Sequence, residues 1–437
     1  MKSLAKWMIC GCGLSLLAAC GDDELILPGE RVDLRTDAPL ARVVVENRTL
    51  PLNPGAEVIN SDWSHLNGSV RHQIQHPALG NTLTQVWARP IGLGNGRKHR
   101  ITASPVVAGE TVYTLDSRAR VTATSQSGQT VWTRDLTPSA DASDDASGGG
   151  LSVSGDTLFV TTAFGELTAI DRLTGDVRWV QDFDSAATGA PTASNGVVYV
   201  VTRNQIGWAI DANDGRILWQ VLGAPSASGI AGGPAPAISD NLVIFPFGSA
   251  QMIGAVPGPG TQIWSANVAG QRPGRAYARI SDITADPVVV GDTIFAGNHA
   301  GRVAAFDATT GGNLWFADTG AIGPLWAAGG SLFLVSDDNR LVRLNAETGE
   351  SIWAVDLPYF RKTRIARRET TFAHYGPVLA GGRLLVPSDD GLIRQFDPES
   401  GEALPSVALP GGAATGPVVA GGTLYVVTED GELRAFR

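Results

Sequence analysis

The sequence predicts an all-β protein, an eight-bladed β-propeller whose blades are four-stranded antiparallel sheets. Three observations predict this fold. An eleven-residue frame that ends in Trp recurs along the chain, and a short apolar run precedes each copy. An isolated strand upstream of the first copy matches a last unit that lacks its fourth strand. One strand-turn unit about every forty residues is typical of propeller blades.

The recurring frame is clearest at Ala169–Trp179, where Asp171, Thr174 and Gly175 precede the Trp. An Asp side chain caps a tight turn, Gly supplies a positive φ, and Trp buries a large ring on the following strand. Further copies span residues 123–132, 209–219, 254–264, 305–315, 343–353 and 395–405. The first of these is one residue short, and the last has Pro405 in place of Trp. We expect the Trp series to pack between blades and not to form a ligand platform.

A second mark, an apolar run followed by a tight-turn signal, precedes the frames. The runs open at Pro105, Leu151, Pro191, Pro236, Pro287, Pro324, Pro377 and Pro417. A Gly or Asn turn follows each run about four residues later, which is typical of a hairpin. Each unit therefore consists of strand, turn, strand, loop, strand, capped turn and Trp strand.

The two ends of the repeat region complete one blade. The last unit, Pro417–Phe436, has three strands, and Leu83–Trp87 is a strand without a blade of its own. Pairing of this N-terminal strand with the C-terminal blade closes the ring and removes its exposed sheet edges. We expect the propeller to span residues 81–437.

The N-terminal residues predict secretion and a lipid anchor. Lys2 and Lys6 precede a short apolar stretch, and residues 17–20 read Leu-Ala-Ala-Cys, the form of a bacterial lipobox. We expect residues 1–19 to be a signal peptide and Cys20 to be acylated, with residues 20–80 as the lipidated Cys and a flexible tether and entry segment. Gly21 after the Cys, instead of Asp, favours the outer membrane. The alternative is an ordinary cleaved signal peptide that happens to be followed by Cys.

Composition excludes several function classes. The formal net charge is −10, which disfavours nucleic acid as a partner. The other two cysteines, Cys10 and Cys12, lie in the signal peptide, so the mature chain has no disulfide and no thiolate metal site. The six histidines form no ligand motif, and we expect no catalytic residue, no metal and no cofactor. His72 and His76 are four residues apart, but they lie in a segment without helical patterning.

Two unusual segments stand outside the strand pattern. Residues 137–150 form an acidic, Gly- and Ser-rich connection. Residues 361–368, Arg-Lys-Thr-Arg-Ile-Ala-Arg-Arg, are the only dense basic run. The simplest interpretation of this run is a solvated loop, and the alternative is docking on an acidic partner or on lipid phosphates.

The frame resembles the repeat of pyrroloquinoline-quinone (PQQ) type propellers over residues 83–437. Quinoprotein dehydrogenases of this type carry adjacent cysteines, which the mature chain lacks. The chain more closely resembles the BamB family of outer-membrane β-barrel assembly lipoproteins, in its lipobox, its single ring and the element Arg279-Ile280-Ser281-Asp282 before Pro287.

The resemblance implies a non-catalytic scaffold lipoprotein of the β-barrel assembly (BAM) complex, anchored on the periplasmic face of the outer membrane. It implies binding to the periplasmic POTRA region of BamA through Arg279, Asp282 and Ile230, and contact with unfolded outer-membrane protein clients. Ala231 stands where the family has Arg, so the contact at Ile230 is incomplete. Two alternatives stay open, namely a PQQ-dependent periplasmic oxidoreductase and a generic ligand-binding or sensor propeller.

Overall fold

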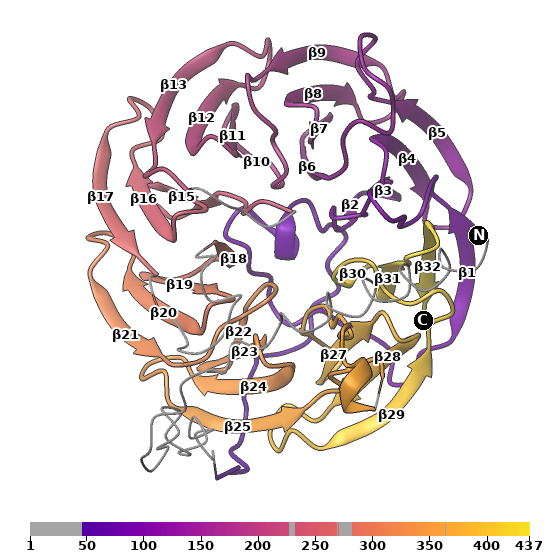
Figure 1. Cartoon of the computed structure of the whole chain (residues 1–437), viewed down its shortest axis with the longest axis vertical. Helices are drawn as coiled ribbons and strands as arrows, with labels where there is room; N and C mark the ends of the chain where they lie inside the picture. Colours follow the sequence, from indigo (N-terminus) through magenta and orange to yellow (C-terminus); the bar gives the residue numbers. More distant parts are fainter. Residues whose placement is uncertain (1–45, 227–231, 269, 271–281, 363) are drawn as a thin grey trace, which may run out of the picture. The chain divides into compact units, whose positions relative to one another are not determined.

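The computed structural model describes residues 46–226, 232–268, 270, 282–362 and 364–437. These residues form eight four-stranded antiparallel sheets arranged as a ring (Figure 1). The predicted eight-bladed propeller is therefore confirmed. Along the described part of the chain, no helix has the length and apolar character needed to cross a bilayer.

The blades follow one another along the chain. Blade 1 contains β2 (Val106–Ala108), β3 (Thr111–Leu115), β4 (Arg120–Ser125) and β5 (Thr130–Asp135). Blade 2 contains β6 (Gly149–Ser154), β7 (Thr157–Thr162), β8 (Glu166–Asp171) and β9 (Val177–Asp182). Blade 3 contains β10 (Thr192–Ser194), β11 (Val197–Thr202), β12 (Ile206–Asp211) and β13 (Ile217–Leu222). Blade 4 contains β14 (Ala237–Ile238), β15 (Val243–Pro246), β16 (Gln251–Ala255) and β17 (Gln262–Asn267).

The second half of the ring repeats this order. Blade 5 contains β18 (Ile283–Val290), β19 (Thr293–Asn298), β20 (Arg302–Asp307) and β21 (Asn313–Ala317). Blade 6 contains β22 (Trp326–Ala328), β23 (Ser331–Val335), β24 (Arg340–Asn345) and β25 (Ser351–Asp356). Blade 7 contains β26 (Val378–Ala380), β27 (Arg383–Ser388), β28 (Leu392–Phe396) and β29 (Ala403–Ala408). Blade 8 contains β30 (Val418–Ala420), β31 (Thr423–Val427), β32 (Glu432–Phe436) and β1 (Gln85–Pro90), and two 3-10 turns, η1 (Leu66–Gly68) and η3 (Ile365–Arg367), lie outside the sheets.

Each Trp of the frame packs on the capped turn of the next blade. Trp132 donates its indole N–H to the carbonyl of Arg172 (3.1 Å), and a Cβ on Gly175 would lie 2.7 Å from the Trp132 ring. Gly175 has φ +79°, so both its backbone and the ring above it require Gly. The same pairing joins Trp87–Gly128, Trp179–Gly215, Trp219–Gly260, Trp264–Gly311, Trp315–Gly349 and Trp353–Gly401. The Trp series is core between blades, as predicted.

The one frame without Trp has a physical explanation in this pairing. Pro405 replaces Trp in blade 7, whose outer strand faces blade 8. Blade 8 has no capped turn between its third and fourth strands, because these strands, β32 and β1, are not consecutive in the chain. A Trp in blade 7 would therefore have no turn to pack against.

Ring closure occurs as the sequence predicts. β1 pairs antiparallel with β32, with Trp87 opposite Ala435. Thr84 and Arg437 extend the pairing through two backbone hydrogen bonds of 2.7 and 3.0 Å. The Trp87 ring lies 6.0 Å from that of Tyr425 on β31. The N-terminal strand thus supplies both backbone pairing and core packing to the last blade.

Residues 46–80, which we name the strap, correct the expected flexible tether. The strap crosses one side of the ring, and its backbone or side chains form hydrogen bonds with backbone groups of all eight blades. Trp63 pairs with Val107 of blade 1 through two hydrogen bonds of 2.8 and 2.9 Å. The Trp63 ring, 1% exposed, stacks on Trp326 of blade 6 at 6.1 Å. Irregular sequence patterning suggested flexibility, but the partners of this segment are distant strands.

Three buried histidines fix the strap. His65 Nε2 lies 3.0 Å from the carbonyl oxygen of Ala193 in blade 3, and His72 Nδ1 lies 2.9 Å from that of Pro287 in blade 5. His76 Nε2 accepts the backbone N–H of Gly382 in blade 7 at 3.0 Å. Burial lowers the pKa of His65 to about 4 and that of His72 to about 3. The pair His72 and His76 therefore has a structural role, as backbone partners of two different blades.

Candidate functional site

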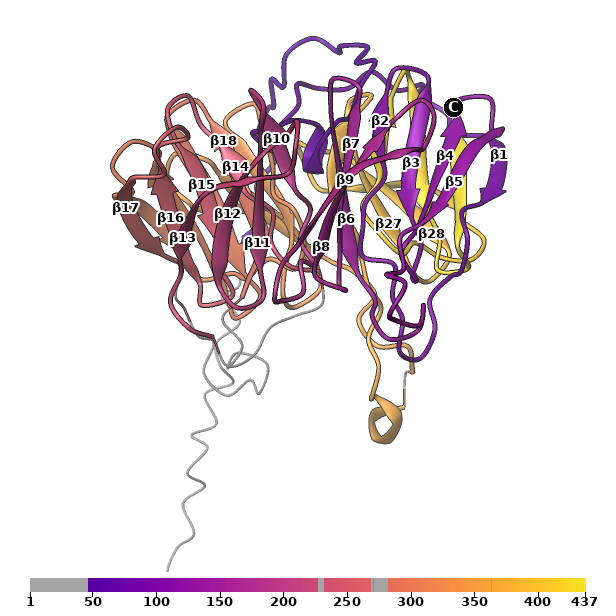
Figure 2. The ribbon, with the colours of Figure 1, turned by 90° about the horizontal axis from the view of Figure 1, so that it is seen from above.

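The ring has two chemically different faces. The turn face carries the hairpin turns and the capped turns, and the strap lies across it. The loop face carries the connections from each blade to the next, and the connection between β25 and β26 projects from it (Figure 2). Since short turns leave little room for variation, side chains that differ from the repeat concentrate on the loop face.

The predicted partner-binding residues belong to two neighbouring connections on the loop face. Ile230 lies between β13 and β14, and Arg279 and Asp282 lie between β17 and β18. Cys20, Ile230 and Arg279 fall outside the described residues. The topology places the two connections at adjacent blades, 3 to 4 and 4 to 5, as a joint contact site requires.

Asp282 is described, and it is buried. Its side chain is 6% exposed, immediately before β18. A Cβ built on Gly248 of blade 4 would lie 3.1 Å from Asp282 Oδ1 and 3.3 Å from Nε2 of Gln205 of blade 3. Because Gly248 has no side chain, Asp282 and Gln205 can approach the backbone of blade 4 at this point. The Asp282 side chain is therefore buried among neighbouring blades at the base of its connection and is not exposed on the surface of the loop face.

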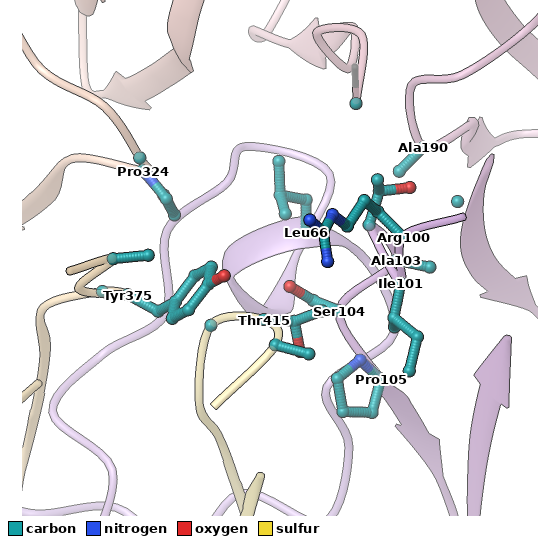
Figure 3. A pocket seen from close by; sticks show the side chains of 18 of the residues that line it. Leu66, Arg100, Ile101, Ala103, Ser104, Pro105, Ala190, Pro324, Tyr375 and Thr415 are labelled. Atoms are coloured by element: carbon teal, nitrogen blue, oxygen red, sulfur yellow. The ribbon is translucent and has the colours of Figure 1, made fainter. Parts of the chain in front are cut away.

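A cavity of about 520 Å³ lies at the centre of the ring, where the starts of all eight blades converge. Leu66 of the strap lines it from the turn face. Arg100, Ser104, Tyr375 and Thr415 surround it (Figure 3). Many of the lining residues are small or carry hydroxyl groups, and polar and apolar surface contribute about equally to the wall, so the cavity can accept a small ligand that has polar groups.

The titratable groups of the cavity come from different blades. Asp286 accepts the backbone N–H of Ala235 at 2.5 Å, and its position deep in the ring raises the pKa of its carboxyl to about 7. His374 lies 2.6 Å from Ser388 Oγ and 2.7 Å from the Pro358 carbonyl oxygen, and burial lowers its pKa. Sequence reasoning missed these groups, because no motif or spacing connects residues that the ring brings together from separate blades.

The cavity does not fit the quinone-dehydrogenase alternative. The three cysteines of the chain are at positions 10, 12 and 20, so no adjacent pair can lie over a quinone. Among the described residues, no group of three His, Cys, Asp or Glu side chains is arranged to hold a metal ion. Asp389, a carboxylate of the lining, is engaged in an ion pair with Arg361.

Comparison with known proteins gives one family. The family model described as outer membrane protein assembly factor BamB matches residues 117–355 and 362–437. The protein of that name from Yersinia pestis is 25% identical over 324 residues, which cover 73% of this chain and 79% of the relative. The protein from Escherichia coli K12 is 25% identical over 325 residues, which cover 73% and 80%.

Two solved structures share the fold. The crystal structure of BamB from Moraxella catarrhalis has a TM-score of 0.68 and 20% identity, and the match covers 82% of this chain and all of that one. A europium-containing methanol dehydrogenase has a TM-score of 0.67 and 14% identity, with 86% and 98% covered. At these identities both structures establish the architecture alone.

Proposed function

Because the chain belongs to the family of the outer membrane protein assembly factor BamB, we propose that it is a non-catalytic scaffold of the β-barrel assembly (BAM) complex. In this proposal Cys20 carries the lipid that holds the protein on the periplasmic face of the outer membrane. The scaffold binds the POTRA region of BamA and assists the folding and insertion of outer-membrane proteins.

The family match carries the proposal, since it includes strands of all eight blades and the matched relatives are named as assembly factors. The architecture supports it, because a ring with a buried strap is rigid and presents its variable connections on one face. Rigid scaffolds that hold binding residues on loops lose little conformational entropy on association.

We place the BamA contact on the loop face, at the connections that contain Ile230, Arg279 and Asp282. Arg279 is the contact residue in this proposal, because Arg is enriched at the centres of interfaces. Asp282 acts as a positioning residue, since it is buried at the foot of the same connection. Leu222, 71% exposed at the end of β13, supplies apolar surface beside the neighbouring connection.

Client binding is assigned to the outer strands. β13 is the outer strand of blade 3, and no strand of the described residues pairs with its outer side. It exposes Ile217 and Leu218 by 42% and 48%. An extended segment with alternating apolar residues can pair with such an edge by adding a strand.

Affinity capture from detergent-solubilised outer membrane tests the function. We expect the wild-type chain to retain BamA and Arg279→Glu to retain at least tenfold less, because a central interface Arg contributes more than about 1.4 kcal/mol. Asp282→Asn, which keeps size and removes charge, should weaken capture less. The matched control reverses the exposed pair Arg216–Asp214 (2.8 Å) on the turn face and should leave capture unchanged.

Two results would contradict the proposal at different levels. Absence of BamA from the wild-type capture would remove the assembly function while the fold stands. Undiminished capture by a folded Arg279→Glu chain would remove only that residue from the contact.

The central cavity favours one further candidate function, a propeller that binds a small polar ligand. Titration with pyrroloquinoline quinone, followed by absorbance and by dye reduction, distinguishes the oxidoreductase form of this candidate. We expect neither a bound-quinone spectrum nor dye reduction.

A further inference from the structure

The connection between blades 6 and 7 forms a narrow projection, which we name the basic finger (residues 359–372). It extends away from the loop face and ends at η3 (Figure 2). Two backbone hydrogen bonds close its base, from Arg361 to Thr370 at 3.0 Å and from Phe372 to Tyr359 at 2.8 Å. The finger is therefore a hairpin-like element with a defined stem.

Its five basic residues divide into two groups. Arg361 pairs with Asp389 and lies over the Phe372 ring at 5.5 Å, and Arg368 lies over the Phe360 ring at 5.0 Å. These two side chains belong to the stem. The other three basic residues are exposed and form no ion pair within the described chain: Lys362, Arg364 and Arg367. Glu369 is the single acidic residue of the finger, so the tip carries uncompensated positive charge.

The tip is also apolar at its end. Ile365 is 80% exposed, more than any other large apolar side chain in the described residues. The aromatic pair Tyr359 and Phe360, with ring centroids 4.5 Å apart, lies in the stem behind it. Basic side chains around an exposed aliphatic residue are typical of segments that enter the headgroup region of a bilayer.

Residues 47–50, near the start of the described chain, approach the strand that precedes the basic finger. Leu50 donates its backbone N–H to Glu399 on the turn face, Arg48 to Ile352 at 3.0 Å, and Asn47 exchanges hydrogen bonds of 3.2 and 3.0 Å with Ala354. Followed backward, the chain thus runs along β25 toward Asp356, the end from which the finger begins. The first described residues therefore lie along the strand that leads into the finger.

We propose that the tip of the basic finger is a second membrane contact, in which Lys362, Arg364 and Arg367 bind the phosphates of anionic lipids and Ile365 inserts into the interface. This inference rests on the proposed lipid anchor at Cys20, which supplies the first contact. Since the chain as a whole carries a charge of −10, repulsion of the remaining surface by anionic lipid orients the ring with its finger toward the bilayer.

Charge and shape distinguish lipid from an acidic protein as the partner. A protein partner requires a broad surface, whereas the exposed part of the finger is a single 3-10 turn with its flanking residues. Lipid headgroups require only a few cations and an apolar tip. Each cation near an anionic surface raises binding about fivefold.

The test uses the acylated full protein in vesicles. After removal of the signal peptide, Cys20 is the sole cysteine and is blocked by lipid, so Ile365→Cys provides one free thiol for an environment-sensitive fluorophore. In vesicles of phosphatidylethanolamine and phosphatidylglycerol we expect a blue-shifted emission that brominated lipid quenches. Replacing Lys362, Arg364 and Arg367 by Glu should weaken this response more than tenfold, and phosphatidylcholine vesicles should give little of it.

The matched control places the label at Leu173→Cys, which is 61% exposed on the turn face. The inference would be overturned if, in anionic vesicles, the label at position 365 showed the same emission and quenching as the label at position 173. In that case the anchor alone would hold the protein on the vesicles. A response that requires added BamA would assign the finger to a protein partner and overturn the lipid contact. Failure of the protein to float with vesicles would instead remove the anchor itself, and the inference with it.

Discussion

The turn face and the loop face of this ring differ in how closely the repeat determines them. On the turn face, Asp171 accepts the backbone N–H groups of Leu173 and Thr174 at 3.0 and 3.1 Å, and the same geometry recurs around Asp307. On the loop face, connections range from the short link before β22 to the finger before β26. The difference indicates that one face holds the ring together while the other is available for binding.

The strap strengthens this contrast. It adds backbone hydrogen bonds and the Trp63–Trp326 stack to the turn face, and Leu66 covers the central cavity from that side. We therefore expect substitutions on the turn face to change the free energy of unfolding, and substitutions on the loop face to change binding.

The largest effect is expected for Trp353→Ala. Trp353 is fully buried and donates to the Pro398 carbonyl at 3.3 Å, so its removal leaves a cavity and an unpaired acceptor. The free energy of unfolding should fall by about 3–5 kcal/mol, measured by urea denaturation. Leu314→Ala, which removes a 55% exposed side chain from the outer strand of blade 5, is the control and should cost less than about 1 kcal/mol.

A pair of Gly substitutions separates backbone strain from packing. Gly196 (φ +80°) has open space where a Cβ would lie, whereas a Cβ on Gly311 (φ +70°) would meet the Trp264 ring at 2.6 Å. Gly196→Ala should cost about 1–2 kcal/mol from backbone strain alone. Gly311→Ala should cost a further ~1–3 kcal/mol, because the indole has to move. Urea denaturation of both variants measures the difference, and equal losses would show that the ring does not constrain the turn.

The strap should make stability depend on pH. Burial lowers the pKa of His72 to about 3, whereas the unfolded chain takes up this proton near pH 6.5. The contribution of His72 to the stability of the wild type therefore falls as pH decreases below 6.5. Asn suits the positive φ of +54° at position 72 and does not titrate. The deficit of His72→Asn relative to wild type should therefore shrink by about 1.6 kcal/mol between pH 6.5 and 5. Denaturation at several pH values measures this, and a constant deficit would contradict it. Comparison with wild type cancels the opposite contribution of Asp286, whose raised pKa favours the folded state as pH falls.

The smallest effect is expected on the loop face. Lys362→Glu in the basic finger should change the free energy of unfolding by less than about 0.5 kcal/mol, because the side chain is exposed and makes no ion pair with the described residues. The same denaturation series measures it. A loss comparable to that of the Gly variants would show that the finger is part of the ring's core.

The fold could be predicted from sequence because its signals are local and repeated. Asp171, Gly175 and Trp179 each specify a turn or a strand within eleven residues, and ring closure followed from counting strands. The strap could not be predicted in this way. Its partners, such as Val107 for Trp63 and Pro287 for His72, are far apart in sequence, and its residues show no strand period.

The candidate site was predictable only in part. The family resemblance selected Ile230, Arg279 and Asp282, and the topology places their connections at adjacent blades. Sequence alone did not indicate that Asp282 is buried, since this depends on Gly248 and Gln205 of two other blades. The sequence also did not indicate that Asn47 lies beside β25, the strand before the finger. This contact joins residues that are 307 positions apart.

Site-specific photocrosslinking in intact cells tests most directly whether the loop face is the partner face. A photoreactive amino acid at Leu222, 71% exposed beside the connection between blades 3 and 4, should crosslink to BamA. The same residue at Leu173, 61% exposed on the turn face, should not. Crosslinks from position 173 without any from position 222 would contradict the assignment of the two faces.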